Sequence, residues 1–193
     1  MGVDASKVFA YYESPFVEKY GATGCAQAAM ATILSYYGLE PFDPGLAERL
    51  FLDPATRPDI VNGAFGTSWE RVRDVLRSRG LNVEAGNVAI LETASDSDID
   101  QMIANLAAWT TQGIPVCAIV GNGEIDGGQG AHWGVVVSAS PTRVILANFP
   151  TGSDPIQHLP AGHLVLTSDV FRNAWKARWL PGVHYAFVAA RPA

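Results

Sequence analysis

The stretch that decides the fold is GATGCAQAAMATILSYYG, residues 21–38. It is rich in alanine and predicts a helix over about residues 25–37, which Gly38 ends. The small side chains would let this helix approach a sheet closely. Cys25 begins the helix, where amide groups without a helical acceptor and the positive end of the helix dipole favour a thiolate. Gly24 lets the backbone turn sharply before it.

Helices dominate the first half of the chain. Thr67 and Glu70 predict a capping box for a helix over about 68–79, and Ser97 with Asp100 predicts a cap for one over about 98–111. Residues 53–66 are rich in Pro, Asp, Asn and Gly, the residues of turns. Shorter elements are predicted at residues 4–12 and 44–51 (helices), 15–24 (a loop) and 81–85 (a strand).

Strands dominate the second half. Short runs of β-branched or aromatic residues, bounded by turn residues, lie at 114–120, 133–139, 143–149 and 184–190. Ser140-Pro141 marks a tight connection between the second and third runs, and a helix over about 168–176 is capped by Thr167 or Ser168. This order predicts an α+β protein, in which a helical lobe packs on an antiparallel sheet.

Composition narrows the class of protein. The 193 residues suit a single domain over 1–193, and 48% hydrophobic residues against 17% charged ones allow a sizeable core. A net charge of −6 without a basic stripe argues against a nucleic-acid partner. No apolar run reaches the roughly 18 residues of a membrane helix, and the N-terminal residues lack the basic flank and apolar stretch expected of a signal peptide. Two cysteines make no disulfide framework, so we expect a reducing cytoplasm.

Three residues are spaced as nucleophilic catalysis requires. Cys25 supplies a thiol, and His132 precedes a predicted strand after the glycine-rich loop GNGEIDGGQGA. Asn148 ends the next predicted strand, so a hairpin of the two strands would bring its amide to the second ring nitrogen of His132. The pattern is that of a nucleophile, a base and a residue that orients the base.

Other polar residues favour structural interpretations. Cys117 lies inside an apolar strand and is expected to be an inert core residue. The histidines at 158, 163 and 184 have no metal-ligand spacing, so we expect neither a metal nor a cofactor. The loop 121–130 is predicted to form a lid or groove wall, with Gly24, Gly130 and Trp133 as groove residues. Trp133 could also shield the neighbouring histidine from water.

The chain resembles the double-glycine, bacteriocin-processing cysteine peptidases and their stand-alone relatives. The resemblance rests on an ordered set of pieces over about residues 15–176: GATGCAQAAMATILSYYG, Gly66-Thr67 with the helix to Gly80-Leu81, Gly113-Ile114-Pro115-Val116, Gly130-Ala131-His132-Trp133, Asn148-Phe149-Pro150, and Leu166-Thr167 through Phe171 to Trp175. It implies a papain-like fold, catalytic roles for Cys25, His132 and Asn148, and a peptide substrate, such as a leader peptide cut after small residues.

Two positions depart from this family. Its oxyanion-hole glutamine lies six residues before the cysteine, where this chain has Lys19. Lys19, together with Cys25, is the candidate for the oxyanion hole, although it is a flexible point charge rather than a fixed amide. The departure leaves open a different donor, such as Tyr20, altered chemistry, or lost activity. Asn148 stands where the family usually has aspartate, and asparagine orients a histidine without adding charge.

Three functions follow from these residues. The first is a cysteine peptidase or amidase that forms a thioester on Cys25. The second is an acyltransferase or amide-forming enzyme of natural-product biosynthesis, in which an amine intercepts the thioester and the acyl donor is an acyl thioester, for example on a carrier protein. The third is a papain-like binding module without catalysis.

Overall fold

The computed structural model describes residues 2–8, 10, 24–61, 64–86, 96–127, 130–149, 160–176 and 186–193. Within these ranges, six α-helices pack together with a six-stranded antiparallel sheet, and a two-stranded sheet lies apart from it. The predicted α+β class is therefore confirmed. Short elements complete the description: the 3₁₀ turn η1 (Ala5–Lys7), strands β1 (Asp59–Val61) and β2 (Ala64–Gly66), and helix α6 (Gly123–Asp126).

The large sheet collects strands from both halves of the chain. Its order is β3-β8-β4-β5-β6-β7, and each neighbouring pair is antiparallel. The strands are β3 (Leu81–Gly86), β4 (Val116–Gly121), β5 (Ala131–Ala139), β6 (Arg143–Ala147), β7 (His163–Thr167) and β8 (Phe187–Pro192). The strand β5, which carries His132, thus lies inside the sheet between β4 and β6.

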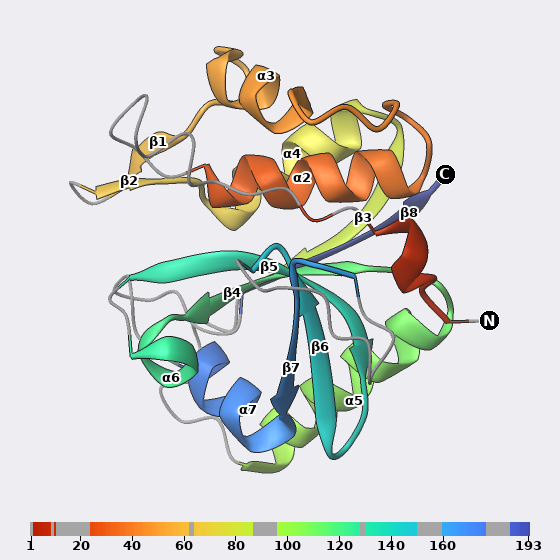
Figure 1. The fold of residues 1–193 in the computed structure, drawn as a ribbon, viewed down its shortest axis with the longest axis vertical. Coiled ribbons are helices and arrows are strands. Elements are labelled where there is room, and N and C mark those ends of the chain that lie inside the picture. The colour runs from red at the N-terminus through yellow and green to blue at the C-terminus, as the bar shows by residue number, and fades with distance from the viewer. Residues whose placement is uncertain are drawn as a thin grey trace.

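Helices cover both faces of this sheet (Figure 1). On one face lie α2 (Cys25–Tyr36), α3 (Leu46–Leu52) and α4 (Trp69–Ser78); on the other lie α5 (Asp96–Thr111) and α7 (Ser168–Lys176). Alternate residues along each strand therefore enter two different cores. In β5, Trp133 and Val135 face the α2 core, whereas Val136 faces the α5 and α7 core. The sequence predicted a helical lobe packed on the sheet, but it did not predict that helices would cover both faces.

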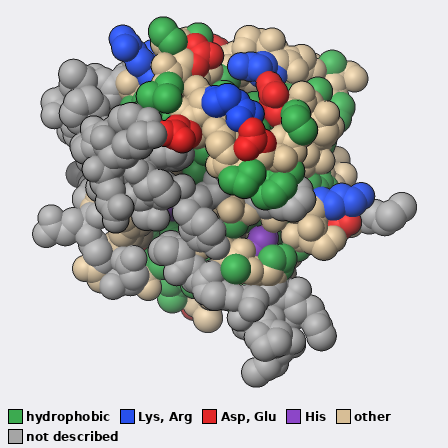
Figure 2. Space-filling model, turned by 45° about the horizontal axis from the view of Figure 1, so that its top comes forward, with side chains coloured by type: hydrophobic (Ala, Val, Ile, Leu, Met, Phe, Trp, Pro, Cys, Tyr) green, Lys and Arg blue, Asp and Glu red, His purple; other side chains and the backbone are tan. Residues whose placement is uncertain are grey.

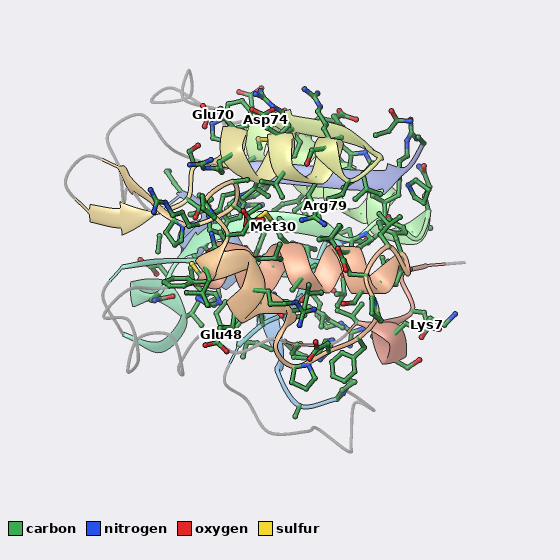
Figure 3. All side chains as sticks on the ribbon, turned by 90° about the horizontal axis from the view of Figure 1, so that it is seen from above. Lys7, Met30, Glu48, Glu70, Asp74 and Arg79 are labelled. Carbon is green, nitrogen blue, oxygen red and sulfur yellow. The ribbon has the colours of Figure 1, made fainter. Side chains whose placement is uncertain are left out.

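The decisive helix forms where its sequence predicts. α2 begins at Cys25 and ends at Tyr36, and Gly38 follows with φ +67°, a conformation that glycine adopts without steric cost. Ala28, Ala29 and Ala31 are almost fully buried, because small side chains let α2 lie close to the sheet. Met30 lies between α2 and α4, while Glu70 and Asp74 lie on the outer side of α4 (Figure 3).

Two predicted helix caps need correction. Ser68, not Thr67, caps α4, since its hydroxyl accepts a hydrogen bond from the Arg71 amide at 3.2 Å. The Thr67 hydroxyl instead accepts from Gln27 and so is committed to a tertiary contact. α5 begins at Asp96, which places Ser97 inside the helix rather than at its cap. The predicted cap of α7 is confirmed, because the Thr167 hydroxyl accepts from the Val170 amide.

Several elements differ from the predicted boundaries. The stretch 53–66 holds β1 and β2, the loop 121–130 holds α6, and β7 was not predicted at all. β8 begins at Phe187, and residues 184 and 185 of its predicted range lie outside the described residues. β6 ends at Ala147, so Asn148 follows the strand instead of ending it. η1 occupies only residues 5–7 of the predicted helix 4–12, and residues 9, 11 and 12 lie outside the described residues.

The visible surface over the helical layer mixes both signs of charge (Figure 2). Arg79 pairs with Glu40 at 2.7 Å, Arg73 pairs with Asp74, and Arg49 pairs with Asp43. Such exposed pairs each contribute little to stability. Among the helices described, none is both long and apolar enough to cross a membrane.

Candidate functional site

The first candidate residue, Cys25, lies at the start of α2. Gly24 is the N-cap and its carbonyl accepts the Ala28 amide at 2.8 Å, which closes the first helical turn. Glycine has no side chain to cap the helix, so the positive end of the dipole is not offset by a capping oxygen. Cys25 is buried, with 9% of the residue's surface exposed.

A buried polar bridge ties the start of α2 to the start of β5. Gln27 Nε2 donates to the Thr67 hydroxyl at 3.1 Å and to the Thr56 carbonyl at 2.7 Å. Trp133 Nε1 donates to the carbonyl of the same Thr67 at 3.0 Å. Because Gln27 follows Cys25 by two residues and Trp133 follows His132 directly, this bridge brings the two candidate segments near one another. This bridge was not predicted, and its one signal in the sequence is a glutamine among the alanines of a buried helix.

His132 lies at the second position of β5 and is almost fully buried. Its Nε2 lies 2.8 Å from the main-chain carbonyl oxygen of Asn148, and its ring lies 4.6 Å from the ring of Phe149. Gly134 makes this packing possible, since a Cβ there would lie 2.9 Å from Phe149 Cε2. The aromatic neighbour of the His132 ring is thus Phe149, whereas the Trp133 indole extends to Thr67.

The contact with Asn148 fixes the tautomer of a neutral His132. A carbonyl oxygen can only accept, so Nε2 must carry the proton at this contact. Nδ1 is then the ring nitrogen with a lone pair, and it is the nitrogen that can accept a proton.

Asn148 reaches His132 in a different way from the predicted one. The amide side chain was expected to hold the imidazole, but the described contact is made by the main-chain carbonyl. The side-chain Oδ1 accepts from the Thr32 hydroxyl of α2 at 3.0 Å. Asn148 has φ +73°, a conformation that asparagine tolerates better than most residues, and this turn directs the chain away from β6.

Cys25 and His132 lie on elements that begin at the same end of the molecule (Figure 1). His132 is in register with Val120, whose side chain belongs to the α5 and α7 core, whereas Cys25 belongs to the α2 core. The register therefore assigns the His132 side chain to the opposite face of the sheet from Cys25. A contact between the sulfur and the imidazole has to be made around the end of the sheet where β5 begins. Ala131, the residue before His132, is exposed.

The remaining predicted residues are placed as follows. Lys19 and Tyr20 lie outside the described residues, as do His158 and His184. Gly130 is half-buried with φ +98°, and Trp133 is 3% exposed, so its indole offers a ligand little surface. Among the described side chains, no group of three or more His, Cys, Asp and Glu could hold a metal ion.

Two further titratable groups are buried in the described core. Cys117 is fully buried in β4, and burial raises the pKa of its thiol to about 12, as expected of an inert core cysteine. Burial also lowers the pKa of His163, an effect that hydrogen bonds with the backbone of Ala161 and Pro160 partly oppose. His163 begins β7 opposite Ala147.

Comparisons with protein-family models and with curated proteins found no relative of this chain. No protein-family model matches the chain, and no curated protein matches it.

Proposed function

We propose that the chain is a papain-like thiol enzyme of the double-glycine peptidase type, in which Cys25 attacks an amide carbonyl of a peptide and His132 transfers the protons. The observation that carries the proposal is that two neighbouring elements, α2 and β5, each begin with a residue suited to one catalytic role or directly before one. An uncapped helix start holds Cys25, and a neighbouring strand start holds a histidine whose Nε2 is engaged by a carbonyl.

Each end supplies one part of the chemistry. The dipole and first-turn amides of α2 favour the thiolate over the thiol, which increases the population of the reactive form. The engaged Nε2 leaves His132 Nδ1 as the proton acceptor, and Phe149 restricts the ring. The bridge through Thr67 holds both segments in a common frame.

The reaction follows from these roles. The Cys25 thiol passes its proton to His132 Nδ1, and the sulfur forms a bond to the carbonyl carbon. The tetrahedral intermediate collapses when the carbon–nitrogen bond breaks, and the imidazolium gives its proton to the leaving amine. Water, activated by the neutral imidazole, then attacks the thioester and releases a carboxylic acid and the free thiol. Main-chain donors at the start of α2 and Lys19 are the proposed partners of the oxyanion.

The proposal is tested by trapping the thioester. The full chain is incubated with S-acetyl-N-acetylcysteamine and with short peptides, and the mass of the intact protein is measured by mass spectrometry. We expect one acyl adduct that is absent in Cys25→Ala and retained in Cys117→Ala, the matched control. An adduct that survives in Cys25→Ala would reject the proposed enzyme. The same conclusion would follow if no variant formed an adduct and Cys25 reacted like an ordinary thiol, and the binding module would then be the remaining function.

The same experiment separates hydrolysis from acyl transfer. Glycinamide is added in excess, and the small-molecule products are identified by mass spectrometry. Acetate alone supports the proposed hydrolase, whereas N-acetylglycinamide formed only in the presence of Cys25 supports an acyltransferase.

A further inference from the structure

We propose that the main-chain carbonyl of Asn148, not its amide, orients His132, and that Thr32 is a positioning residue that holds this carbonyl in place. The inference deepens the proposed function and rests on it only for its consequence, namely the reactivity of Cys25. The orientation of the imidazole is a separate property and can be measured by itself.

The carbonyl is better suited than an amide to hold one tautomer. A side-chain amide has both a donor and an acceptor end, so after a flip it can bind either form of an imidazole. The Asn148 carbonyl accepts only, at 2.8 Å from Nε2, and so selects the form with a proton on Nε2. Its direction is set by φ +73° at Asn148, which makes the backbone conformation part of the site.

Thr32 fixes that conformation from the nucleophile helix. Its hydroxyl lies 3.0 Å from Asn148 Oδ1 and 3.0 Å from the Ala28 carbonyl, and it shares its single proton between them. Thr32 is fully buried and Asn148 is 2% exposed, so water does not compete for these bonds. The helix that begins at Cys25 therefore also holds, through Asn148, the group that binds the base.

In this arrangement the side-chain amide of Asn148 has a structural role and does not orient the imidazole. The side chain anchors residue 148 to α2, and the backbone of the same residue meets His132. A displacement of α2 relative to β6 would therefore move the carbonyl and change the hold on the ring.

The first test compares Thr32→Val with Thr32→Ser. Valine keeps the shape and removes the hydroxyl, whereas serine keeps the hydroxyl. The readout is the rate of Cys25 alkylation by iodoacetamide at about pH 6.5, where an ordinary thiol is largely protonated. We expect the rate to fall by about tenfold in Thr32→Val, because one hydrogen bond that positions Asn148 is lost. The rate should recover in Thr32→Ser. Equal rates in both variants and the wild type would overturn the inference.

The second test compares Asn148→Gly with Asn148→Ala. Both remove the amide, but glycine adopts positive φ readily and alanine does not. If the carbonyl orients His132, Cys25 of the glycine variant is alkylated several-fold faster than Cys25 of the alanine variant, because positive φ is strained in alanine. Equal losses in the two variants would assign the role to the amide.

A third measurement separates this inference from the proposed function. Long-range ¹⁵N–¹H spectra report the tautomer of His132, with His132→Gln used to assign its signals. We expect the Nε2–H form in the wild type and in Thr32→Ser, and a larger Nδ1–H fraction in Thr32→Val. This result would stand even if Cys25 proved unreactive, and an Nδ1–H wild type would overturn it whatever the enzyme does.

Discussion

The two cysteines of the chain are both buried but occupy different positions in the fold. Cys25 lies at the start of α2, 9% exposed, near β5, whose second residue is His132. Cys117 lies in the middle of β4, fully buried among apolar side chains, and burial raises the pKa of its thiol to about 12. Burial therefore makes ionisation of Cys117 unfavourable, whereas under the proposed function the start of α2 favours the thiolate of Cys25.

The largest expected effect is selective alkylation. Iodoacetamide should label Cys25 of the folded protein at least about 100-fold faster than Cys117, because Cys117 reacts only after the sheet opens. Peptide mapping by mass spectrometry measures both rates in one sample. In denaturant the two rates should converge, and comparable rates in the folded protein would break the comparison.

The packing at His132 can be disturbed without touching either cysteine. In Gly134→Ala the new Cβ would meet Phe149 at 2.9 Å, so Phe149 has to move and the ring of His132 loses its neighbour. We expect the free energy of unfolding to fall by about 1–3 kcal/mol and Cys25 alkylation to slow, while Cys117 stays protected.

Gly66→Ala is the matched control for this change. A Cβ at Gly66 meets no atom within 4 Å, so its stability should change by less than about 0.5 kcal/mol. Chemical denaturation measures both variants, and an equal loss in the two would show that the contact with Phe149 is not the cause.

Alkaline pH tests the effect of burial on the Cys117 thiol. Burial raises the pKa of Cys117 from 9.0 to about 12, so between these values the unfolded chain has lost the proton and the folded chain keeps it. The folded state then binds more protons, and stability falls as pH rises through this window, by up to about 1.4 kcal/mol per pH unit.

Cys117→Ala should flatten this decline between about pH 9 and pH 12. Part of the decline should remain in the variant, because burial also raises the pKa of Tyr37. Urea denaturation at a series of pH values gives the slopes, and identical slopes in wild type and variant would contradict the effect assigned to Cys117.

The smallest expected effect concerns the bridge between α2 and β5. Trp133→Phe keeps an aromatic ring and removes the indole donor to the Thr67 carbonyl, which should cost about 1 kcal/mol of stability. Cys25 alkylation should slow slightly, because the start of β5 is held less firmly. Trp109→Phe changes a tryptophan that packs on Phe187 far from this bridge, and there the alkylation rate should stay at the wild-type value.

Local sequence predicted the elements whose signals are continuous. The alanine-rich run with Gly38 predicted α2 within a residue of its observed end, and the runs around Ser140-Pro141 predicted the β5–β6 hairpin that brings Asn148 to His132. The prediction failed where the deciding contact came from elsewhere in the chain. Thr67 matched the capping pattern, but its hydroxyl accepts from Gln27 of α2, and Ser68 takes the cap.

By itself, the sequence determined that a cysteine begins a buried helix and that the second half forms strands, because helix and strand periodicity act over a few neighbouring residues. The tertiary structure alone decided that helices cover both faces of the sheet, and that residue 148 offers its carbonyl to His132 while its amide meets Thr32. Such choices depend on contacts between segments more than 100 residues apart in the chain, and no local pattern records which of two polar groups on one residue will face a given partner.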